Sequence, residues 1–118
     1  MTVSTKLVWT PNTKAADGSL LSAAQLATLT YTALIDTVSP PVTSYQVPTD
    51  KITSAAGPNG AQLQCAFADL VPPFVPVDDV QYFAELTETD AAGTSVPTAI
   101  VTFTNTVVPG APLDFGVA

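Results

Sequence analysis

Four stretches of the chain alternate between apolar and polar residues, and this period of two predicts β-strands that bury one face. The stretches are residues 2–10, 29–37, 61–70 and 80–89. On their predicted inner faces lie Val3, Thr5, Leu7 and Trp9; Leu29, Tyr31, Ala33 and Ile35; Leu63, Cys65 and Phe67, before Leu70; and Tyr82, Ala84 and Leu86. A further strand is predicted over the β-branched residues 97–106, and a short edge segment from residue 42 to residue 47 or 52.

Prolines and glycines predict where these strands end. Pro40-Pro41 stops the second stretch, because proline has no N–H to give to a sheet ladder. Residues 22–29 could form a helical turn, but the β-branched residues beside them argue against a long helix. Turns are predicted at Asp17-Gly18, at residues 55–61 (AAGPNGA) and at residues 90–93, and a proline-rich connection at residues 71–79 (VPPFVPVDD).

Every long predicted element is therefore a strand, and the regular spacing of turns favours an antiparallel β-sandwich of about seven strands. The 118 residues are enough for one domain with a real core. We expect that domain in residues 1–106, followed by a Pro/Gly elbow and a strand-like tail in residues 107–118.

The charge and the cysteine content argue against several classes of binding site. Lys6, Lys14 and Lys51 are the only basic residues, and the net charge is −7. Binding to nucleic acid is not expected, since that affinity comes mainly from Lys and Arg. One Cys and no His rule out an internal disulfide and a Cys/His zinc site. No cofactor is expected.

The N-terminal sequence MTVSTKLVWT enters a strand pattern directly, without the basic and apolar regions of a secretory signal, and no apolar run approaches membrane-spanning length. If Met1 is native, we expect synthesis in the cytoplasm, no membrane partner, and export only by another route, such as the release of assembled particles.

Several segments together resemble the fibronectin type III family, over roughly residues 3–104. Trp9 and Tyr31, on either side of a Pro- and Asp-Gly-containing loop, match core positions of strands B and C in that family. LQCAFADL is similar to strand E and ends at the family's Leu, here Leu70, and Tyr82 in VQYFAEL stands at the tyrosine position of strand F. The resemblance implies an immunoglobulin-like sandwich. Two departures are the long stretch from Leu70 to Tyr82, and Glu88 where the family has a small apolar residue.

The resemblance also predicts that strand A is missing, because the residues before Trp9 are needed for strand B. The tail VVPGAPLDFGVA resembles the elbow that leads into the next domain's strand A in arrays of this family. Its alternating residues Leu113, Phe115 and Val117 could fill the slot of a neighbouring copy, giving a ring or filament. They could instead fold back on their own domain, or remain frayed or bound to a partner.

Candidate catalytic and ligand-binding residues are few. Cys65 is expected to be a small core residue. It is not expected to be a nucleophile, because the chain has no His to activate it. The strand alternation places Trp9, Tyr31 and Tyr82 on the faces expected to form the core. They are therefore not expected to form a surface on which sugars stack. Asp17, Asp78 and Asp79 lack the spacing of a calcium loop. Glu85, Glu88 and Asp90 could supply paired carboxylates for glycoside hydrolysis, but a small sandwich seldom has the cleft that this needs, so solvated strand ends are favoured.

These observations favour a non-catalytic structural or interaction subunit with protein partners, and a bacteriophage virion protein of the decoration, neck or tail is the concrete expectation. The alternative is a monomeric adhesion or glycan-binding module that acts through its loops, where Phe74 is the one convincing loop aromatic. A hydrolase is the least favoured class, because no catalytic motif supports it.

Overall fold

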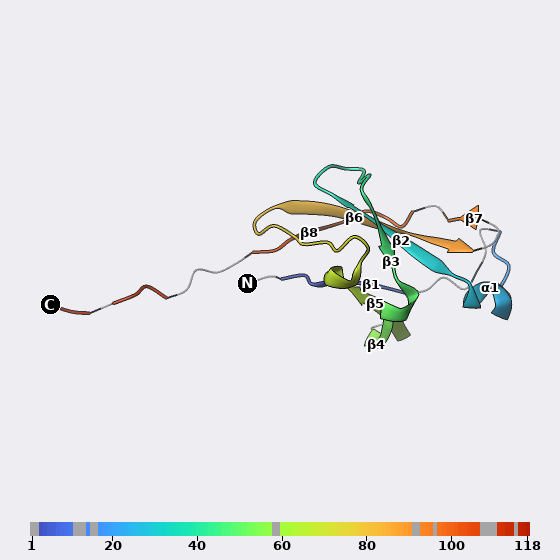
Figure 1. Cartoon of the computed structure of the whole chain (residues 1–118), viewed down its shortest axis with the longest axis horizontal. Coiled ribbons are helices and arrows are strands. Elements are labelled where there is room, and N and C mark those ends of the chain that lie inside the picture. The colour runs from blue at the N-terminus through green and yellow to red at the C-terminus, as the bar shows by residue number, and fades with distance from the viewer. Residues whose placement is uncertain are drawn as a thin grey trace.

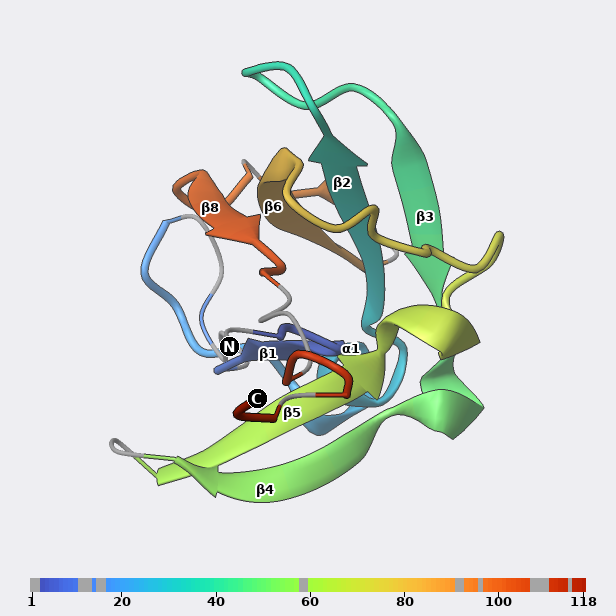
Figure 2. The same ribbon diagram turned by 90° about the vertical axis from the view of Figure 1, so that its left-hand side faces the viewer.

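The computed structural model describes residues 3–10, 14, 17–57, 60–90, 93–95, 97–106, 111–114 and 116–118, and for residues 55–57, 60 and 61 it describes the backbone alone. These residues form two antiparallel sheets (Figure 1). Seen along the long axis of the molecule, the two sheets form two layers (Figure 2). The buried core residues come from both layers and from the connection before β6. The all-β fold expected from the alternation is confirmed at this level.

The smaller sheet has the order β1-β5-β4. Its strands are β1 (Lys6–Trp9), β5 (Gly60–Ala66) and β4 (Thr53–Gly57). β5 lies in the middle, and pairs Leu7 with Cys65 and Trp9 with Leu63. β1 and β4 are therefore the two edges of this sheet.

The larger sheet is built around β2 (Thr30–Asp36) and β6 (Gln81–Asp90), which pair along the whole of β2 from Thr30↔Thr89 to Asp36↔Phe83. β3 (Ser44–Val47) pairs with the other side of β2. β7 (Gly93–Thr94) and β8 (Val101–Thr104) pair with successive parts of β6. Both long strands are thus central in this sheet.

The helical elements are short. α1 (Ala23–Ala27) begins at Ser22, whose hydroxyl accepts from the N–H of Gln25 while the Gln25 side chain accepts from the N–H of Ser22. This reciprocal pair is a capping box, and it stabilises a helix start that composition alone leaves weak. The 3-10 turns η1 (Thr49–Lys51) and η2 (Phe67–Asp69) follow β3 and β5.

Most of the core lies where the period-two pattern places it, but Val3 and Thr5, which were expected on the inner face of the first stretch, are exposed. Tyr31, Ala33 and Ile35 of β2 are 4%, 0% and 1% exposed, which is the expected inner face of that strand. Cys65 and Leu70 are each 1% exposed and close the core from the smaller sheet and the turn after it. Trp9 and Leu7 are only partly buried and pack at the margin of this cluster.

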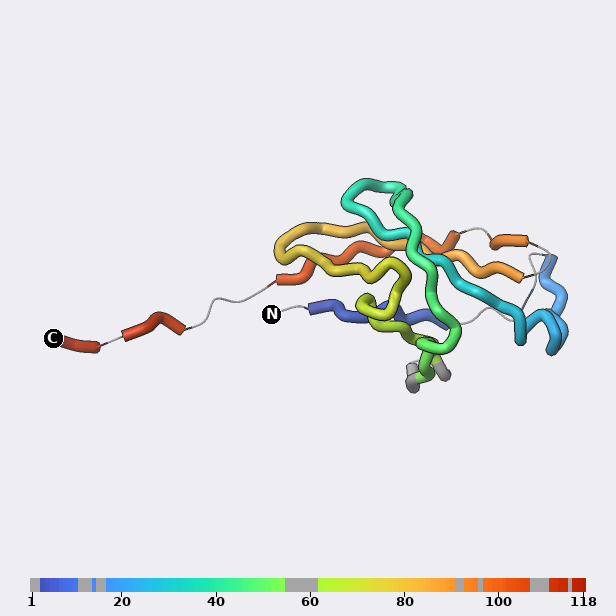
Figure 3. The backbone as a smooth tube through the Cα atoms, in the orientation of Figure 1, coloured from blue at the N-terminus to red at the C-terminus, as the bar shows by residue number. Residues whose placement is uncertain are grey.

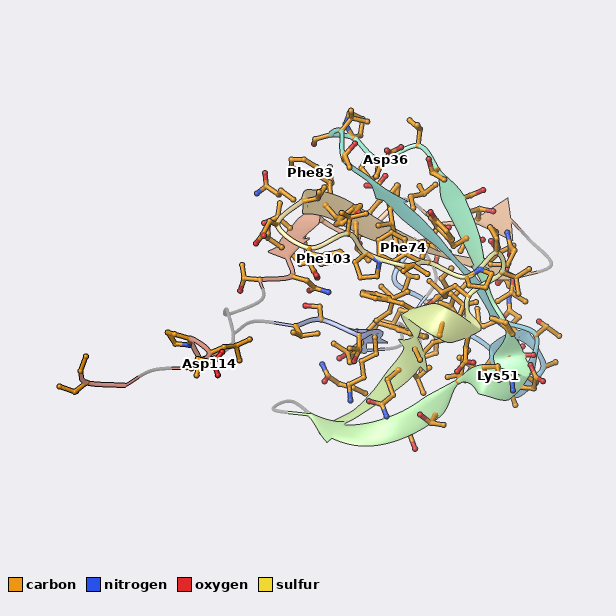
Figure 4. All side chains as sticks on the ribbon, turned by 60° about the vertical axis from the view of Figure 1, so that its left-hand side comes forward. Asp36, Lys51, Phe74, Phe83, Phe103 and Asp114 are labelled. Carbon is orange, nitrogen blue, oxygen red and sulfur yellow. The ribbon has the colours of Figure 1, made fainter. Side chains whose placement is uncertain are left out.

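Phe74 corrects the expectation that it is a loop aromatic available for binding, because it is only 6% exposed. Its ring contacts Phe67 and Tyr82 edge to face at centroid distances of 5.1 Å each. The proline-rich connection therefore inserts an aromatic side chain between the sheets, where Phe103 of β8 also points (Figure 4). Such edge-to-face pairs favour a fixed arrangement of the rings.

Several element boundaries differ from those predicted. β4 occupies Thr53–Gly57, most of which was expected to be a turn, and the two-residue β7 brings the strands of the described chain to eight. The sequence TSAAG has no alternation of large apolar residues, since β4 is an edge strand paired only with β5. β1 and β8 are each four residues long, shorter than the predicted stretches.

The hydroxyl of Tyr82 joins the start of β6 to the connection before it. It accepts a hydrogen bond of 2.9 Å from the backbone N–H of Val77. Tyr82 itself is 7% exposed, so its ring is held by the core while the hydroxyl fixes the proline-rich segment. This bond forms despite the long stretch between Leu70 and Tyr82.

Tyr82→Phe should lower the free energy of unfolding by about 1–2 kcal/mol, because the N–H of Val77 loses its partner in a partly buried position. Urea titration followed by tryptophan fluorescence measures the effect. Tyr45→Phe is the matched control, because the hydroxyl of this partly buried tyrosine has no hydrogen bond among the described residues. Equal stability of both variants would contradict a role for the bond.

Candidate functional site

The outer edge of β1 has backbone groups that no described strand pairs with. In an antiparallel ladder, residues alternate between exchanging hydrogen bonds with the partner strand and pointing their N–H and C=O away from it. The N–H of Phe67 donates to the C=O of Thr5 at 2.9 Å, and the register continues through Leu7↔Cys65 and Trp9↔Leu63. The N–H and C=O groups of Lys6 and Val8 therefore point away from β5.

Asn105 occupies one position of this edge. Its side-chain oxygen accepts from the N–H of Ser4 at 2.7 Å, and its Nδ2 donates to the C=O of Ser4 at 3.0 Å. The amide thus does for Ser4 what a neighbouring strand would do. Asn105 is 4% exposed and follows β8, so the contact also ties the two sheets together at the beginning of β1.

The apolar character of the β1 edge distinguishes it from the other edge of the same sheet. Leu7 and Trp9 face the core but stay partly exposed, and Val8 on the opposite face is 53% exposed. β4 has the sequence Thr-Ser-Ala-Ala-Gly and offers no large apolar side chain. An added strand would therefore bury more apolar surface at β1 than at β4.

The described residues of the tail, 111–114 and 116–118, belong to no strand. Leu113 and Val117 are 89% and 94% exposed, and Phe115 lies outside the described residues. The tail points away from the two sheets and lengthens the molecule to 73 Å (Figures 1 and 3). The described tail residues thus do not fold back onto their own sheets in this structure.

The position of Asn105 explains why folding back is unfavourable. Because Asn105 bonds to Ser4, the chain leaves the body beside the beginning of β1. An antiparallel partner of β1 would have to start at Trp9, so the chain would first travel the length of the strand in the opposite direction. Six residue steps of a strand already measure about 20 Å.

The three carboxylates proposed for hydrolysis divide between the two faces of β6. Glu85 and Glu88 are an odd number of residues apart in β6, so they lie on opposite faces of the sheet. Glu88 is partly buried and stands opposite Tyr31 in the register, on the face of Tyr82. Asp90 shares that face at the end of β6, where its side chain accepts from the N–H of Gly93.

The aromatic residues proposed as a platform belong to the core and its margin. Tyr31 and Tyr82 are buried, and the ring of Trp9 lies 5.0 Å from that of Tyr31 at 54°. Burial raises the pKa of the Tyr31 hydroxyl.

Cys65 and the aspartates have structural surroundings. Burial raises the pKa of the Cys65 thiol, which disfavours the reactive thiolate. Asp17 accepts hydrogen bonds from the hydroxyl and the N–H of Ser19, and these lower the pKa of its carboxyl. The N–H of Asp79 donates to the C=O of Asn105.

Within the part of the chain that the structure describes, no group of three potential metal-ligating residues comes together, and no helix could span a membrane.

Sequence reasoning overlooked Asn105, the residue that defines this edge. It ends the β-branched stretch VTFTN, where an Asn is normally taken as a strand terminator. Its partner Ser4 is 101 residues away in the sequence, so no local signal could reveal the bond.

Comparisons with known proteins add no assignment. No protein-family model matches the chain, and searches of curated proteins and of solved structures found no significant match. The inference of function therefore rests on the edge and the tail.

Asn105→Ala should cost about 1–3 kcal/mol of folding stability, because two backbone groups of Ser4 and a contact between the sheets are lost together. Gln46→Ala, at an exposed amide, should change stability by less than about 0.5 kcal/mol. Chemical denaturation of the two variants makes the comparison. A loss at Asn105 no larger than that at Gln46 would show that the edge does not need this amide.

Proposed function

We propose that this protein is a non-catalytic structural subunit that assembles with further copies by donating its C-terminal tail as a β-strand. The observation that carries the proposal is the coincidence of an unpaired apolar edge at β1 with an exposed, alternating apolar tail on the same chain. An open edge of this kind is a template for pairing with another chain. β-strand addition would satisfy the backbone groups and bury the apolar residues at once.

The order of the strands supports the fibronectin type III-like, immunoglobulin-like form of the fold. Such sandwiches place strands A, B, E and D in one sheet and C, F and G in the other. With β1 as strand B, the smaller sheet reads B-E-D and the larger reads C'-C-F-G. The position next to β1 is then that of strand A.

Two side chains give further support. Tyr82, near the start of the proposed strand F, accepts from the N–H of Val77 five residues upstream, as in the tyrosine corner of these sandwiches. Leu70 is 1% exposed at the proposed end of strand E. Neither feature specifies a ligand, because this fold serves many functions.

The setting we propose is a bacteriophage virion, as a decoration, neck or tail component, or another assembly of repeated copies. A protein with few charges and exposed hydroxyls and carboxylates suits dense packing against copies of itself. The buried position of Phe74 leaves the alternative of a glycan-binding loop without its aromatic anchor. Protein partners are therefore favoured over carbohydrate.

Removal of residues 112–118 should convert concentration-dependent oligomers into monomers, and Leu113→Asp with Val117→Asp should do the same. Burial of each apolar side chain can contribute about 1.5–3 kcal/mol to association before the entropy of ordering is subtracted. Size-exclusion chromatography with light scattering gives the mass of each species.

The matched control introduces the same charges elsewhere, at Val42 and Val75, which are 72% and 78% exposed. Val42→Asp with Val75→Asp should leave the oligomers intact. A full chain that remains a monomer at every concentration would reject the proposal.

A further inference from the structure

We infer that the tail of one copy pairs antiparallel with β1 of the next, with Asp114 opposite Val8 and Gly116 opposite Lys6. This inference rests on the proposed function and specifies its acceptor, direction and register. It follows from three features of the described chain: where the tail leaves the body, which groups of β1 are free, and where Asn105 blocks the edge.

The direction follows from the path of the tail. It leaves beside Ser4, where β1 begins, and its described residues point away from β1 (Figure 1). A tail that continues along the long axis reaches a second, similarly oriented copy at the end of β1 that carries Trp9. It then runs from Trp9 towards Lys6, which is antiparallel to β1.

The faces of the strands restrict the register. Leu7 and Trp9 face the core, and residues directly opposite one another in a ladder lie on the same face. Leu113 and Val117 can therefore be buried only opposite odd-numbered residues of β1. Asp114 and Gly116 then stand opposite the even-numbered residues, whose N–H and C=O groups are free to pair.

Asn105 decides between the registers that remain. A shift that places Gly116 opposite Ser4 leaves Gly116 facing backbone groups that already bond to the Asn105 amide, whereas in the intermediate register only Ala118 faces Ser4. A shift in the other direction moves Leu113 beyond Trp9, where β1 ends, and leaves it with less to pack against. The intermediate register places Leu113 opposite Trp9 and ends the ladder at Lys6.

Charge and proline agree with this register. Asp114 lies diagonally across from Lys6, within reach of its long side chain, and diagonal pairs of opposite charge stabilise a sheet. Pro112 stands opposite Thr10 and, lacking an N–H, ends the ladder at that side. Asp114 has a φ of 55° in the single chain, so pairing requires it to move to an extended conformation.

The consequence is a polar, head-to-tail assembly. The donating tail and the accepting edge are different surfaces of one copy, so each copy keeps one of each free after its first contact. Such heterologous interfaces form rings when the rotation between copies closes and filaments when it does not.

Cysteine pairs test the register in the full chain. Residues opposite each other in a ladder have Cα atoms about 5.5 Å apart, within the roughly 4.4–6.8 Å range of disulfides. Val8→Cys with Asp114→Cys should give a ladder of disulfide-linked oligomers under mild oxidation. The pairs Lys6→Cys with Asp114→Cys and Thr10→Cys with Asp114→Cys report the two shifted registers and should link several-fold less. The unsubstituted chain is the control, since Cys65 is only 1% exposed.

Each result has one meaning. Oligomers linked mainly through either shifted pair would overturn the register while the proposed function stands. A disulfide within one chain would show that the tail folds back, and this would overturn the inference and the proposed function together. The variants could also form oligomers of the same mass as the unsubstituted chain without any of the three pairs forming a disulfide. This result would place the tail on another surface and overturn the inference alone.

Discussion

The backbone of an edge strand needs hydrogen-bond partners, and this requirement organises the smaller sheet. β1 pairs with β5 on one side. On the other side, the Asn105 amide bonds to Ser4, which lies just before β1. Leu7 and Trp9 face inward yet stay partly exposed, and the N–H and C=O groups of Lys6 and Val8 point away from β5. Incomplete hydrogen bonding and incomplete burial thus coincide at one edge, as expected where a strand is still to be added.

The β3 edge of the larger sheet is partly covered by the proline-rich connection. Val71 of the proline-rich connection exchanges both backbone hydrogen bonds with Gln46, and so covers part of the β3 edge. A few residues later Phe74 enters the core and Tyr82 holds the N–H of Val77. The connection therefore covers part of the β3 edge of the larger sheet from within the chain. This contrast supports the β1 edge as the proposed site of assembly.

The central strands could be predicted from the sequence because burial on one face dictates the period of two. Tyr31, Ala33 and Ile35 show this directly. β4 could not be predicted from the sequence, because an edge strand of small and polar residues shows no alternation of apolar and polar positions. The inward position of Phe74 escaped prediction because proline-rich segments are normally exposed. The hydrogen bonds of Asn105 to Ser4 join residues that are 101 positions apart in the sequence, so no local motif predicts them.

Amide hydrogen exchange at β1 tests the central claim most directly. The account predicts that the amides of Lys6 and Val8 exchange slowly in the assembled full chain and quickly in a chain that lacks residues 112–118. The amides of Leu7 and Trp9, which face β5, should be protected in both and serve as the internal reference. Equally fast exchange of Lys6 and Val8 with and without the tail, in a full chain that is assembled, would contradict the account.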